Sequence, residues 1–372
     1  MLSRDTFLEI DLSAYKSNIA FFTKKLFPTK LMAVVKSNAY GHGAVEISHA
    51  AIESGVDRLA VAFLEEALEL RAAGITVPIL VFNYFNPRYA VEALKNKLTI
   101  TIYSRRQLEE IKKHIPSGLK VHLNLDTGMR RLGPDINNAL ELAIDISRTG
   151  YDLEGVYTHF AVADEKKEQF TLAQVLIYKK FLEELKKARV NIKIRHVANS
   201  AGALRFNESI FDYARIGVAS YGLQPSEEFY IDELMPVLTW KSVVSYVKKI
   251  KKGDSVSYGR TFIAPRDMTV ATIPVGYGDG YNRGLSNKGE VLISGKRCRI
   301  IGRVCMDQFV VDVSHLPQKP KMGDEVVLIG TQGEENITAE ELAKLLGTIN
   351  YEITCAITSR VPRIYLRREN LT

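Results

Sequence analysis

The chain has 372 residues, of which 46% are hydrophobic and 25% are charged, a composition that excludes an intrinsically disordered protein. At about 150 residues per domain, this length predicts two domains or three. The net charge of +7 comes from scattered lysine pairs such as Lys24-Lys25 and Lys186-Lys187 in helix-like stretches. It therefore indicates solvated helix faces and argues against a nucleic-acid partner.

The three cysteines favour a reducing compartment. Cys298, Cys305 and Cys355 cannot all be paired, and they do not have the spacing of metal ligands, so no metal site is expected. The N-terminus has no basic segment followed by an apolar core, and no run of about 18 apolar residues occurs. We expect a cytoplasmic protein with no membrane partner.

The first predicted elements are a strand at 6–12 and a helix at 15–26, with Asp11 or Ser13 as a possible N-cap. The apolar run 31–35 follows; it is short, rich in β-branched residues and without two-fold alternation, as in a parallel strand buried on both faces. Lys36 ends this run and would lie at the rim of the sheet. An amine there is a candidate covalent catalyst, although a lysine ending a strand is more often a solvated rim residue.

Short apolar runs alternate with helix-like stretches as far as about Gly222, as in 164–190, where Phe170, Ile177 and Phe181 recur at helical spacing. Eight strands alternating with helices favour an α/β fold with a (β/α)8 TIM-like barrel over 13–230, since a doubly wound sheet would usually stop at five or six. The eight predicted strands are 31–35, 59–63, 78–82, 98–103, 119–126, 155–160, 194–199 and 214–222.

After a linker near 223–236 the pattern changes to that of a mainly β C-terminal domain, 231–372. Ser294-Gly295-Lys296 is typical of a hairpin turn, and Thr338 with Glu341 predicts a capping box at the start of a helix. The predicted strands are 237–247, 268–275, 290–294, 297–306, 309–313 and 324–329.

Barrel enzymes gather their catalytic groups at the carboxyl ends of the strands. In this chain those ends carry one lysine, one histidine, two arginines and a serine: Lys36, Arg131, His159, Ser200 and Arg215. Each of three has an ordinary alternative, since Arg131 could be a surface cation, Ser200 a helix cap and His159 a core histidine. Arg215 lies within an apolar strand, where a guanidinium needs partners to offset its desolvation.

The segment Ala33-Val-Val-Lys36-Ser-Asn-Ala-Tyr40-Gly-His-Gly43 resembles the cofactor segment of alanine racemases, which join pyridoxal 5′-phosphate (PLP) to this lysine. The resemblance extends from Phe7 to Arg363 and implies that strand 1–12 packs with the C-terminal domain. By resemblance, the cofactor's phosphate is bound by Tyr40, by Ser200 with the amides around Gly217 and Val218, and by Tyr351; Arg215 donates to the pyridine nitrogen, and Arg131 to the phenolic oxygen.

The same resemblance implies a homodimer with shared active sites. Val256-Ser-Tyr258-Gly259-Arg260 is similar to the segment that carries the second catalytic base, Tyr258, into the partner's site, where His159 would orient it. Met306, through its backbone amide, and Asp307 would help to position the carboxylate of an amino acid substrate. The implied activity is the interconversion of L-alanine and D-alanine, which supplies D-alanine for peptidoglycan.

Racemisation removes a Cα proton from one face and returns one to the other, so two bases are expected, here Lys36 and Tyr258. A tyrosine has a reference pKa of about 10, so nearby positive potential must favour its phenolate, and His159 is the expected source. An arginine beside the pyridine nitrogen keeps that nitrogen neutral, which favours racemisation over transamination.

Four positions depart from the family pattern. Asn124 stands where many members carry a carbamylated lysine that braces the arginine matching Arg131, and an anion such as chloride is a plausible substitute. Arg130 replaces a common glycine, Ile216 a common proline and Ser359 a common tyrosine. These changes bear on rate and substrate range.

Four other functions are compatible with parts of this sequence. A PLP-dependent decarboxylase of basic amino acids would need an acidic partner for the pyridine nitrogen, where this chain has Arg215. A PLP-binding regulatory barrel would lack the β domain, and an aldolase using Lys36 without PLP would leave the phosphate ligands unused. A racemase for serine or for a larger amino acid is the fourth alternative.

Overall fold

The chain folds into two compact units in the computed structural model, which describes residues 4–367. The barrel unit comprises 15–39 and 44–234, and the β unit comprises the described residues of 1–14, 40–43 and 235–372. Each unit thus contains segments from distant parts of the sequence, because the chain leaves the barrel briefly after its first strand.

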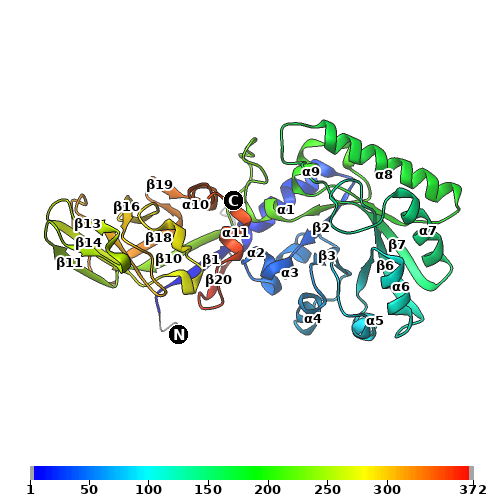
Figure 1. The fold of residues 1–372 in the computed structure, drawn as a ribbon, viewed down its shortest axis with the longest axis horizontal. Helices are drawn as coiled ribbons and strands as arrows, with labels where there is room; N and C mark the ends of the chain where they lie inside the picture. The colour runs from blue at the N-terminus through cyan, green and yellow to red at the C-terminus, as the bar shows by residue number, and fades with distance from the viewer. Residues whose placement is uncertain (1–3, 368–372) are drawn as a thin grey trace. The chain divides into compact units, whose positions relative to one another are not determined.

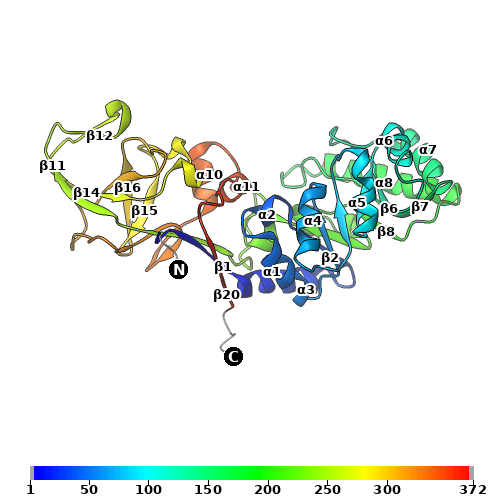
Figure 2. The same cartoon turned by 90° about the horizontal axis from the view of Figure 1, so that it is seen from below.

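The barrel unit is a closed ring of eight parallel strands, in which the first strand pairs with the last. The helices lie outside this ring (Figures 1 and 2). The strands are β2 (Lys30–Val34), β3 (Arg58–Val61), β4 (Ile79–Val81), β5 (Thr99–Ile102), β6 (Ser117–Asn124), β7 (Gly150–Tyr157), β8 (Ile194–His196) and β9 (Tyr213–Ile216). The helices include α1 (Leu12–Leu26), α3 (Ala44–Glu53), α4 (Leu64–Ala72), α5 (Ala90–Lys95), α6 (Arg105–Lys112), α7 (Ile136–Ser147), α8 (Gln169–Lys187) and α9 (Ser200–Arg205).

The predicted barrel is confirmed, and the burial of its strands explains why the pattern revealed it. Every residue of β3, β4, β5 and β9 is buried, as expected for parallel strands covered on one side by helices and on the other by the barrel interior. Asp11 lies just before α1, and its Oδ1 accepts from the backbone N–H groups of Ser13 and Ala14 at 2.9 and 3.0 Å. Asp11 is therefore the cap of this helix.

Most predicted strand bounds differ from the structure by a few residues, and two barrel strands differ most. β7 begins at Gly150 and not at 155, because Gly150 and Asp152 pair with the lengthened start of β6. The strand predicted at 214–222 ends at Ile216, after which Val218–Tyr221 form the 3-10 turn η3 and Gly222 adopts a left-handed conformation. Apolar composition alone does not separate a buried strand from a buried turn.

The β unit contains a 10-stranded sheet to which the N-terminal strand belongs. β1 (Phe7–Asp11) pairs antiparallel with β10 and parallel with β20. A two-stranded sheet of β12 and β13 accompanies it. The further strands are β10 (Leu238–Val243), β11 (Tyr246–Ile250), β12 (Ser255–Val256), β13 (Phe262–Ile263), β14 (Met268–Ile273), β15 (Glu290–Ile293), β16 (Lys296–Ile301), β17 (Phe309–Asp312), β18 (Glu325–Gln332), β19 (Glu335–Ile337) and β20 (Arg363–Leu366).

The single strand predicted at 237–247 is two strands. The backbone N–H of Val244 donates to Asp324 O, whereas that of Ser245 donates to Thr272 O, so the chain changes neighbours between them. β10 accordingly pairs with β18, and β11 pairs with β14. The short strands β12, β13, β19 and β20 and the helix α11 (Asn350–Cys355) were not predicted, because segments this short carry little periodicity.

The predicted hairpin is confirmed, and the capping box is half right. Ser294 and Gly295 have φ of 51° and 67°, as a type I′ turn between two antiparallel strands requires. Thr338 Oγ1 accepts from the backbone N–H of Glu341 at 3.1 Å and caps α10 (Ala339–Leu346). The Glu341 carboxylate, however, accepts from Arg297 at 2.7 and 3.0 Å and is not turned back to the cap.

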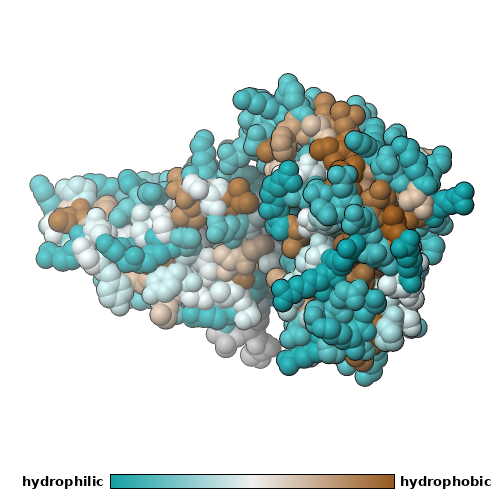
Figure 3. Space-filling model, turned by 45° about the vertical axis from the view of Figure 1, so that its right-hand side comes forward, coloured by the Kyte–Doolittle hydropathy of each residue, from teal (hydrophilic) through white to brown (hydrophobic). Residues whose placement is uncertain are grey.

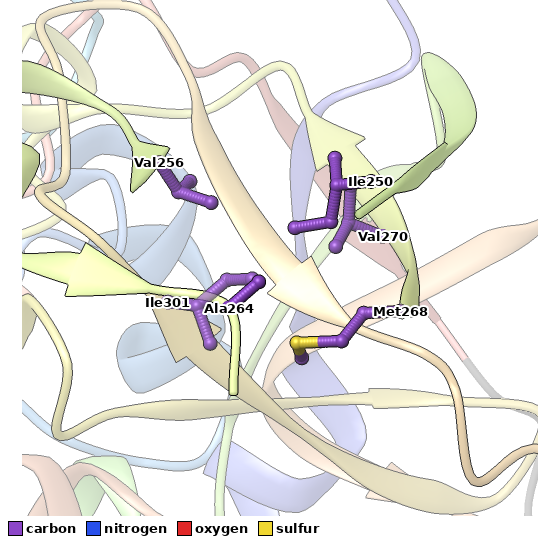
Figure 4. Packing of buried hydrophobic residues seen from close by; sticks show 6 residues of the cluster. All are labelled: Ile250, Val256, Ala264, Met268, Val270 and Ile301. Atoms are coloured by element: carbon purple, nitrogen blue, oxygen red, sulfur yellow. The ribbon is translucent and has the colours of Figure 1, made fainter. Parts of the chain in front are cut away.

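A compact apolar cluster in the β unit supports the loop that carries Tyr258. Its six residues come from several strands and pack side by side (Figure 4). Val256, only two residues before Tyr258, is one of them, so the start of this loop is anchored in the core. The cluster consists of Ile250, Val256, Ala264, Met268, Val270 and Ile301.

The surface is mostly polar, with apolar residues gathered in patches on the face seen in Figure 3. Among residues 4–367, no helix is both long enough and apolar enough to cross a bilayer.

Candidate active site

Lys36 opens a left-handed turn. β2 ends at Val34, one residue before the predicted end at 35, and α2 (Lys36–Tyr40) follows. Ser37, Asn38 and Ala39 have φ of 54°, 51° and 53°, and Tyr40 has a φ of 53°. L-residues disfavour this conformation by about 1–2 kcal/mol each. Such strain persists only where the surrounding structure over-determines it, and it is concentrated at functional sites.

The turn is fixed by groups that the sequence analysis did not identify. Glu66 Oε1 accepts from the backbone N–H of Ser37 at 2.5 Å, while its Oε2 accepts from Ala62 and Phe63 at 2.7 and 3.0 Å. Asn38 Oδ1 accepts from Ala44 N at 2.8 Å. Glu66 thus ties the turn after Lys36 to the loop after β3. Its position near the start of a helix was the only available signal, and it does not reveal the second contact.

Arg215 is buried in β9 and has a full set of acceptors around its two terminal nitrogens. Nη1 donates to His196 Nδ1 at 2.8 Å and to His196 O at 3.1 Å. Nη2 lies 2.8 Å from Thr158 O, 2.9 Å from Val197 O and 3.2 Å from His159 Nδ1. The Nε–H has no acceptor among the described residues. A buried guanidinium with one remaining donor is suited to a ligand that offers a single acceptor.

The charges on this rim follow from burial. Desolvation lowers the pKa of Arg215 to about 10, which leaves it protonated at neutral pH. Burial, reinforced by Arg215, Arg131 and Lys36, holds the pKa of His159 well below its usual value. His159 is therefore a neutral imidazole whose Nδ1 accepts from Arg215. The positive potential expected to favour the Tyr258 phenolate therefore comes from Arg215, Arg131 and Lys36. The assignment of this potential to His159 is corrected.

Ser200 faces the backbone that follows the next strand, β9, and does not cap its helix. Asn199 is the N-cap of α9, and its Oδ1 accepts from Gly202 N at 2.9 Å. Ser200 Oγ accepts from Gly217 N at 3.1 Å and from Ala219 N at 3.5 Å. The helix-cap alternative for Ser200 is wrong. The hydroxyl and these amides, with Val218 beside them in η3, form a small polar cluster at the carboxyl ends of β8 and β9.

Arg131 lies in the loop after β6 and is exposed. Asn124 Nδ2 donates to Leu132 O at 3.1 Å, so the amide that replaces the family's lysine holds this loop directly. Asp126 Oδ1 accepts from Gly128 N and Arg130 N at 2.8 and 3.1 Å. Arg130 has a φ of 56°, a conformation that explains why glycine is common at this position in the family.

A buried glutamine joins the loops that carry Arg131 and His159. Gln174 Nε2 donates to Thr127 Oγ1 at 3.0 Å and to His159 O at 3.1 Å, and its Oε1 accepts from Ala161 N at 3.0 Å. Gln174 comes from α8, and its polar type on the buried face of that helix was the only signal in the sequence.

In the β unit the two proposed phosphate tyrosines lie near each other. The rings of Tyr40 and Tyr351 have centroids 6.0 Å apart. A Cβ at Gly41 would lie 2.1 Å from Thr354 O, so only glycine permits this approach to α11. Arg363 donates to Gly41 O at 3.1 and 3.2 Å. These contacts fix the position of Tyr40 within the unit.

Tyr258 is 73% exposed at the start of the 3-10 turn η4 (Tyr258–Arg260). Ser257, with a φ of 63°, donates from its hydroxyl to Arg303 O at 2.6 Å, which joins this turn to the segment that carries Met306. Met306 is 53% exposed. The fold therefore brings the segments that carry Tyr258 and Met306, which are distant in the sequence, together at the surface of this unit.

Asp307 is engaged in an ion pair, since its Oδ1 accepts from Arg360 Nη2 at 2.7 Å. A carboxylate would repel an anionic substrate group. The backbone N–H groups of Met306 and Asp307 make no hydrogen bond to any described residue. They are the groups of this segment that could bind an anion.

Comparisons with known proteins cover almost the whole chain. The family model described as the alanine racemase N-terminal domain matches residues 10–225, and that of the alanine racemase C-terminal domain matches 237–365. An alanine racemase of Symbiobacterium thermophilum is 45% identical, with 97% of each chain covered. Alanine racemase 1 of Bacillus subtilis is 43% identical, with 99% of this chain and 95% of the relative covered.

Solved structures agree with this assignment. The alanine racemase of Bacillus anthracis with bound L-Ala-P has a TM-score of 0.94 at 42% identity, covering 99% of this chain and 96% of its own. The alanine racemase of Clostridium difficile 630 has a TM-score of 0.93 at 37% identity, covering 100% of this chain and 98% of its own. Both domain models and full-length relatives agree, so the chain belongs to the alanine racemase family.

Proposed function

We propose that the protein is a PLP-dependent racemase that interconverts L-alanine and D-alanine and supplies D-alanine for peptidoglycan. The observation that carries this proposal is the buried Arg215, which keeps one N–H unused on the rim of a barrel whose full length matches alanine racemases. A decarboxylase would instead need an acidic group at that point.

The donors of this chain fit PLP. Lys36 would hold its aldehyde carbon, and the Nε–H of Arg215 suits a neutral pyridine nitrogen, which offers one lone pair. Ser200 with the amides of Gly217 and Val218 would bind the phosphate, with Tyr40 and Tyr351 as further phosphate ligands. Arg131 would donate to the phenolic oxygen. Bound PLP withdraws electrons from the substrate's Cα and so makes its proton acidic.

Two side chains would move that proton. Lys36 serves one face of Cα and Tyr258 the other, so that a proton removed by one is replaced by the other. His159 is neutral and accepts from Arg215 at Nδ1, which leaves Nε2–H as a donor to orient the Tyr258 oxygen. Because the pKa of Arg215 remains near 10, this residue donates a hydrogen bond at neutral pH without giving up its proton.

We further propose a homodimer with shared sites in the cytoplasm. Tyr258 and Met306 are largely exposed in the β unit, although both are assigned to the active site, and a second chain would give them a partner. The backbone N–H groups of Met306 and Asp307 would then bind the substrate carboxylate. None of the three cysteines forms a disulfide among the described residues, which suits a reducing compartment.

Chiral chromatography tests the activity. Purified protein supplied with PLP should convert either enantiomer of alanine to an equal mixture, and serine and larger amino acids should react more slowly. A faster reaction with serine would assign the other racemase specificity, and protein that neither binds PLP nor racemises any amino acid would refute the proposal.

The Tyr258→Phe variant tests the second base. Removal of the hydroxyl should reduce Cα–H exchange in deuterated water by about 10²-fold or more for one enantiomer only, since Lys36 still serves the other face. The cofactor's absorbance should be unchanged. Equal, full-rate exchange of both enantiomers would contradict the role of Tyr258.

A further inference from the structure

The barrel interior contains a chain of buried polar side chains that leads away from Arg215. It runs through His196, His122 and Glu154 to Arg58, and we call these four residues the relay. His196 Nε2 lies 2.9 Å from His122 Nδ1, and His122 Nε2 lies 3.1 Å from Glu154 Oε2. Arg58 donates to both oxygens of Glu154 at 2.8 and 3.2 Å. All of these side chains are at least nine-tenths buried.

The direction of every hydrogen bond follows from the donor and acceptor inventory. Arg215 can only donate, so His196 Nδ1 must accept, and a neutral His196 then carries its proton on Nε2. That proton is donated to His122 Nδ1, so His122 likewise carries its proton on Nε2. His122 donates to Glu154, a carboxylate that can only accept. The relay therefore has one consistent proton arrangement.

Electrostatics favour the same arrangement. A protonated His196 would present an N–H to the N–H of Arg215, so the contact requires the neutral form. Burial, and then the neighbouring charges of Arg215 and His122, hold the pKa of His196 well below its usual value. Burial also lowers the pKa of His122. Burial acts to raise the pKa of Glu154, but hydrogen bonds from His122 and Arg58 outweigh it and lower this pKa.

The surrounding structure is shaped around the relay. A Cβ at Gly155 would lie 2.7 Å from Cε1 and 2.8 Å from Nε2 of His122, so only glycine leaves room for this imidazole. The Tyr157 ring stacks on His196 at 4.8 Å with an interplanar angle of 11°, and its hydroxyl is 3.0 Å from Thr101 Oγ1. Lys120 Nζ lies 3.5 Å from Glu154, and this lysine is largely exposed.

We propose that the relay holds Arg215 in one orientation and one charge state, and that its members are positioning residues for the racemisation. The inference rests on the proposed function, because Arg215 is the group it positions. A neutral histidine with a fixed acceptor nitrogen directs Nη1 of Arg215 inward, which leaves Nε–H for the ligand. The distant carboxylate of Glu154 stabilises the guanidinium through the two aligned imidazoles.

Histidine tautomers provide a readout that does not depend on turnover. In PLP-loaded enzyme labelled with ¹⁵N-histidine, His122 and His196 should both be neutral with Nε2–H from about pH 5.5 to about 8.5. His122→Gln and His196→Gln assign the signals. A protonated imidazole or an Nδ1–H form at either residue would overturn the relay. Other titratable groups facing it are Lys120 from β6, Tyr157 from β7, Tyr178 from α8, and Tyr213 from β9.

Gly155→Ala tests the consequence for the reaction, since it displaces His122 without changing a charge. We expect kcat to fall about tenfold with KM within about threefold, together with altered tautomers of His122 and His196. Val121→Ala is the matched control, because Val121 is buried on the same strand as His122 with its side chain on the opposite face. It should lower Tm but leave both tautomers and kcat nearly unchanged.

The outcomes separate the two proposals. Wild-type enzyme that racemises alanine, with Gly155→Ala showing altered tautomers and unchanged kcat, would reduce the relay to a structural role and overturn the inference. Wild-type enzyme without racemase activity would refute the proposed function instead. If Gly155→Ala does not fold, Glu154→Gln replaces it, with the same tenfold loss of kcat expected and an unchanged kcat overturning the inference.

Discussion

At the scale of single residues, Arg215 is a buried cation whose terminal nitrogens have many hydrogen-bond acceptors. Five oxygen or nitrogen acceptors surround its terminal nitrogens, and they belong to Thr158, His159, His196 and Val197. A lysine has three donors on one nitrogen and cannot reproduce this planar arrangement. The site therefore selects arginine for its shape as well as for its charge.

Arg215→Lys is expected to lower kcat/KM by about 10²-fold, because the lost fork leaves acceptors unpaired and moves the remaining donor. Steady-state kinetics in both directions would measure this. The control is Arg195→Lys, a partly exposed arginine on β8 that pairs with Asp212. Similar losses in the two variants would indicate general damage to the barrel instead of a role for Arg215.

The sequence could identify single site residues only at the carboxyl ends of the barrel strands, where barrel enzymes carry their catalytic groups. Strand ends in a barrel share one rim, so Lys36, His159 and Arg215 could be nominated from their positions in eight apolar runs. His122 and Glu154 lie within strands, where alternation says only that a side chain faces the interior. Their mutual contacts depend on which strands close the ring, and no local pattern encodes that.

At the scale of elements, the strand β2 is followed by a turn whose backbone is strained because its residues are left-handed. The sequence predicted that Lys36 lies at the rim of the sheet, but no residue type demands the left-handed conformation at Ala39. Tertiary contacts impose it, above all those of Glu66. An element of this kind can be recognised only when its partner from another loop is known.

Glu66→Ala should destabilise the barrel unit by about 1–2 kcal/mol, because three backbone N–H groups lose their acceptor. It should also weaken retention of PLP, since the strained turn begins at Lys36. Urea unfolding and cofactor absorbance after gel filtration would measure both effects. Glu65→Ala, an exposed neighbour on the same helix, is the control. Identical behaviour of the two variants would contradict the role of Glu66.

At the scale of the whole molecule, three buried or partly buried histidines make stability depend on pH. The pKa values of His122, His159 and His196 are all lowered, first of all by burial. In the unfolded chain each would titrate near 6.5. Below that pH the unfolded state binds more protons than the folded state. The contribution of these histidines to the free energy of unfolding is therefore fully present above about pH 6.5 and is lost as the pH falls.

Between about pH 6 and the lowered pKa values, each histidine makes the free energy of unfolding fall by about 1.4 kcal/mol per pH unit. The three together therefore contribute a slope of about 4 kcal/mol per pH unit. Urea unfolding at a series of pH values would measure the slope. His196→Gln should reduce this slope by about 1.4 kcal/mol per pH unit. Stability independent of pH between 5 and 6.5 would contradict this reading.

The proposed sharing of active sites between two chains makes a second prediction for the assembly. Lys36→Ala and Tyr258→Phe homodimers should each be nearly inactive, but a mixed dimer contains one site with both residues intact. Random mixing of equal amounts should therefore restore about a quarter of the wild-type activity. Mixed dimers of verified composition without activity would mean that Lys36 and Tyr258 do not act across chains.

The asparagine that braces the Arg131 loop has a metabolic consequence. Asn124 supports Leu132 through a side-chain amide, and an amide nitrogen does not react with carbon dioxide as a lysine amine does. The loop is thus held by a group that needs no dissolved gas to complete it. This protein is therefore expected to keep its Arg131 loop in place at any bicarbonate concentration.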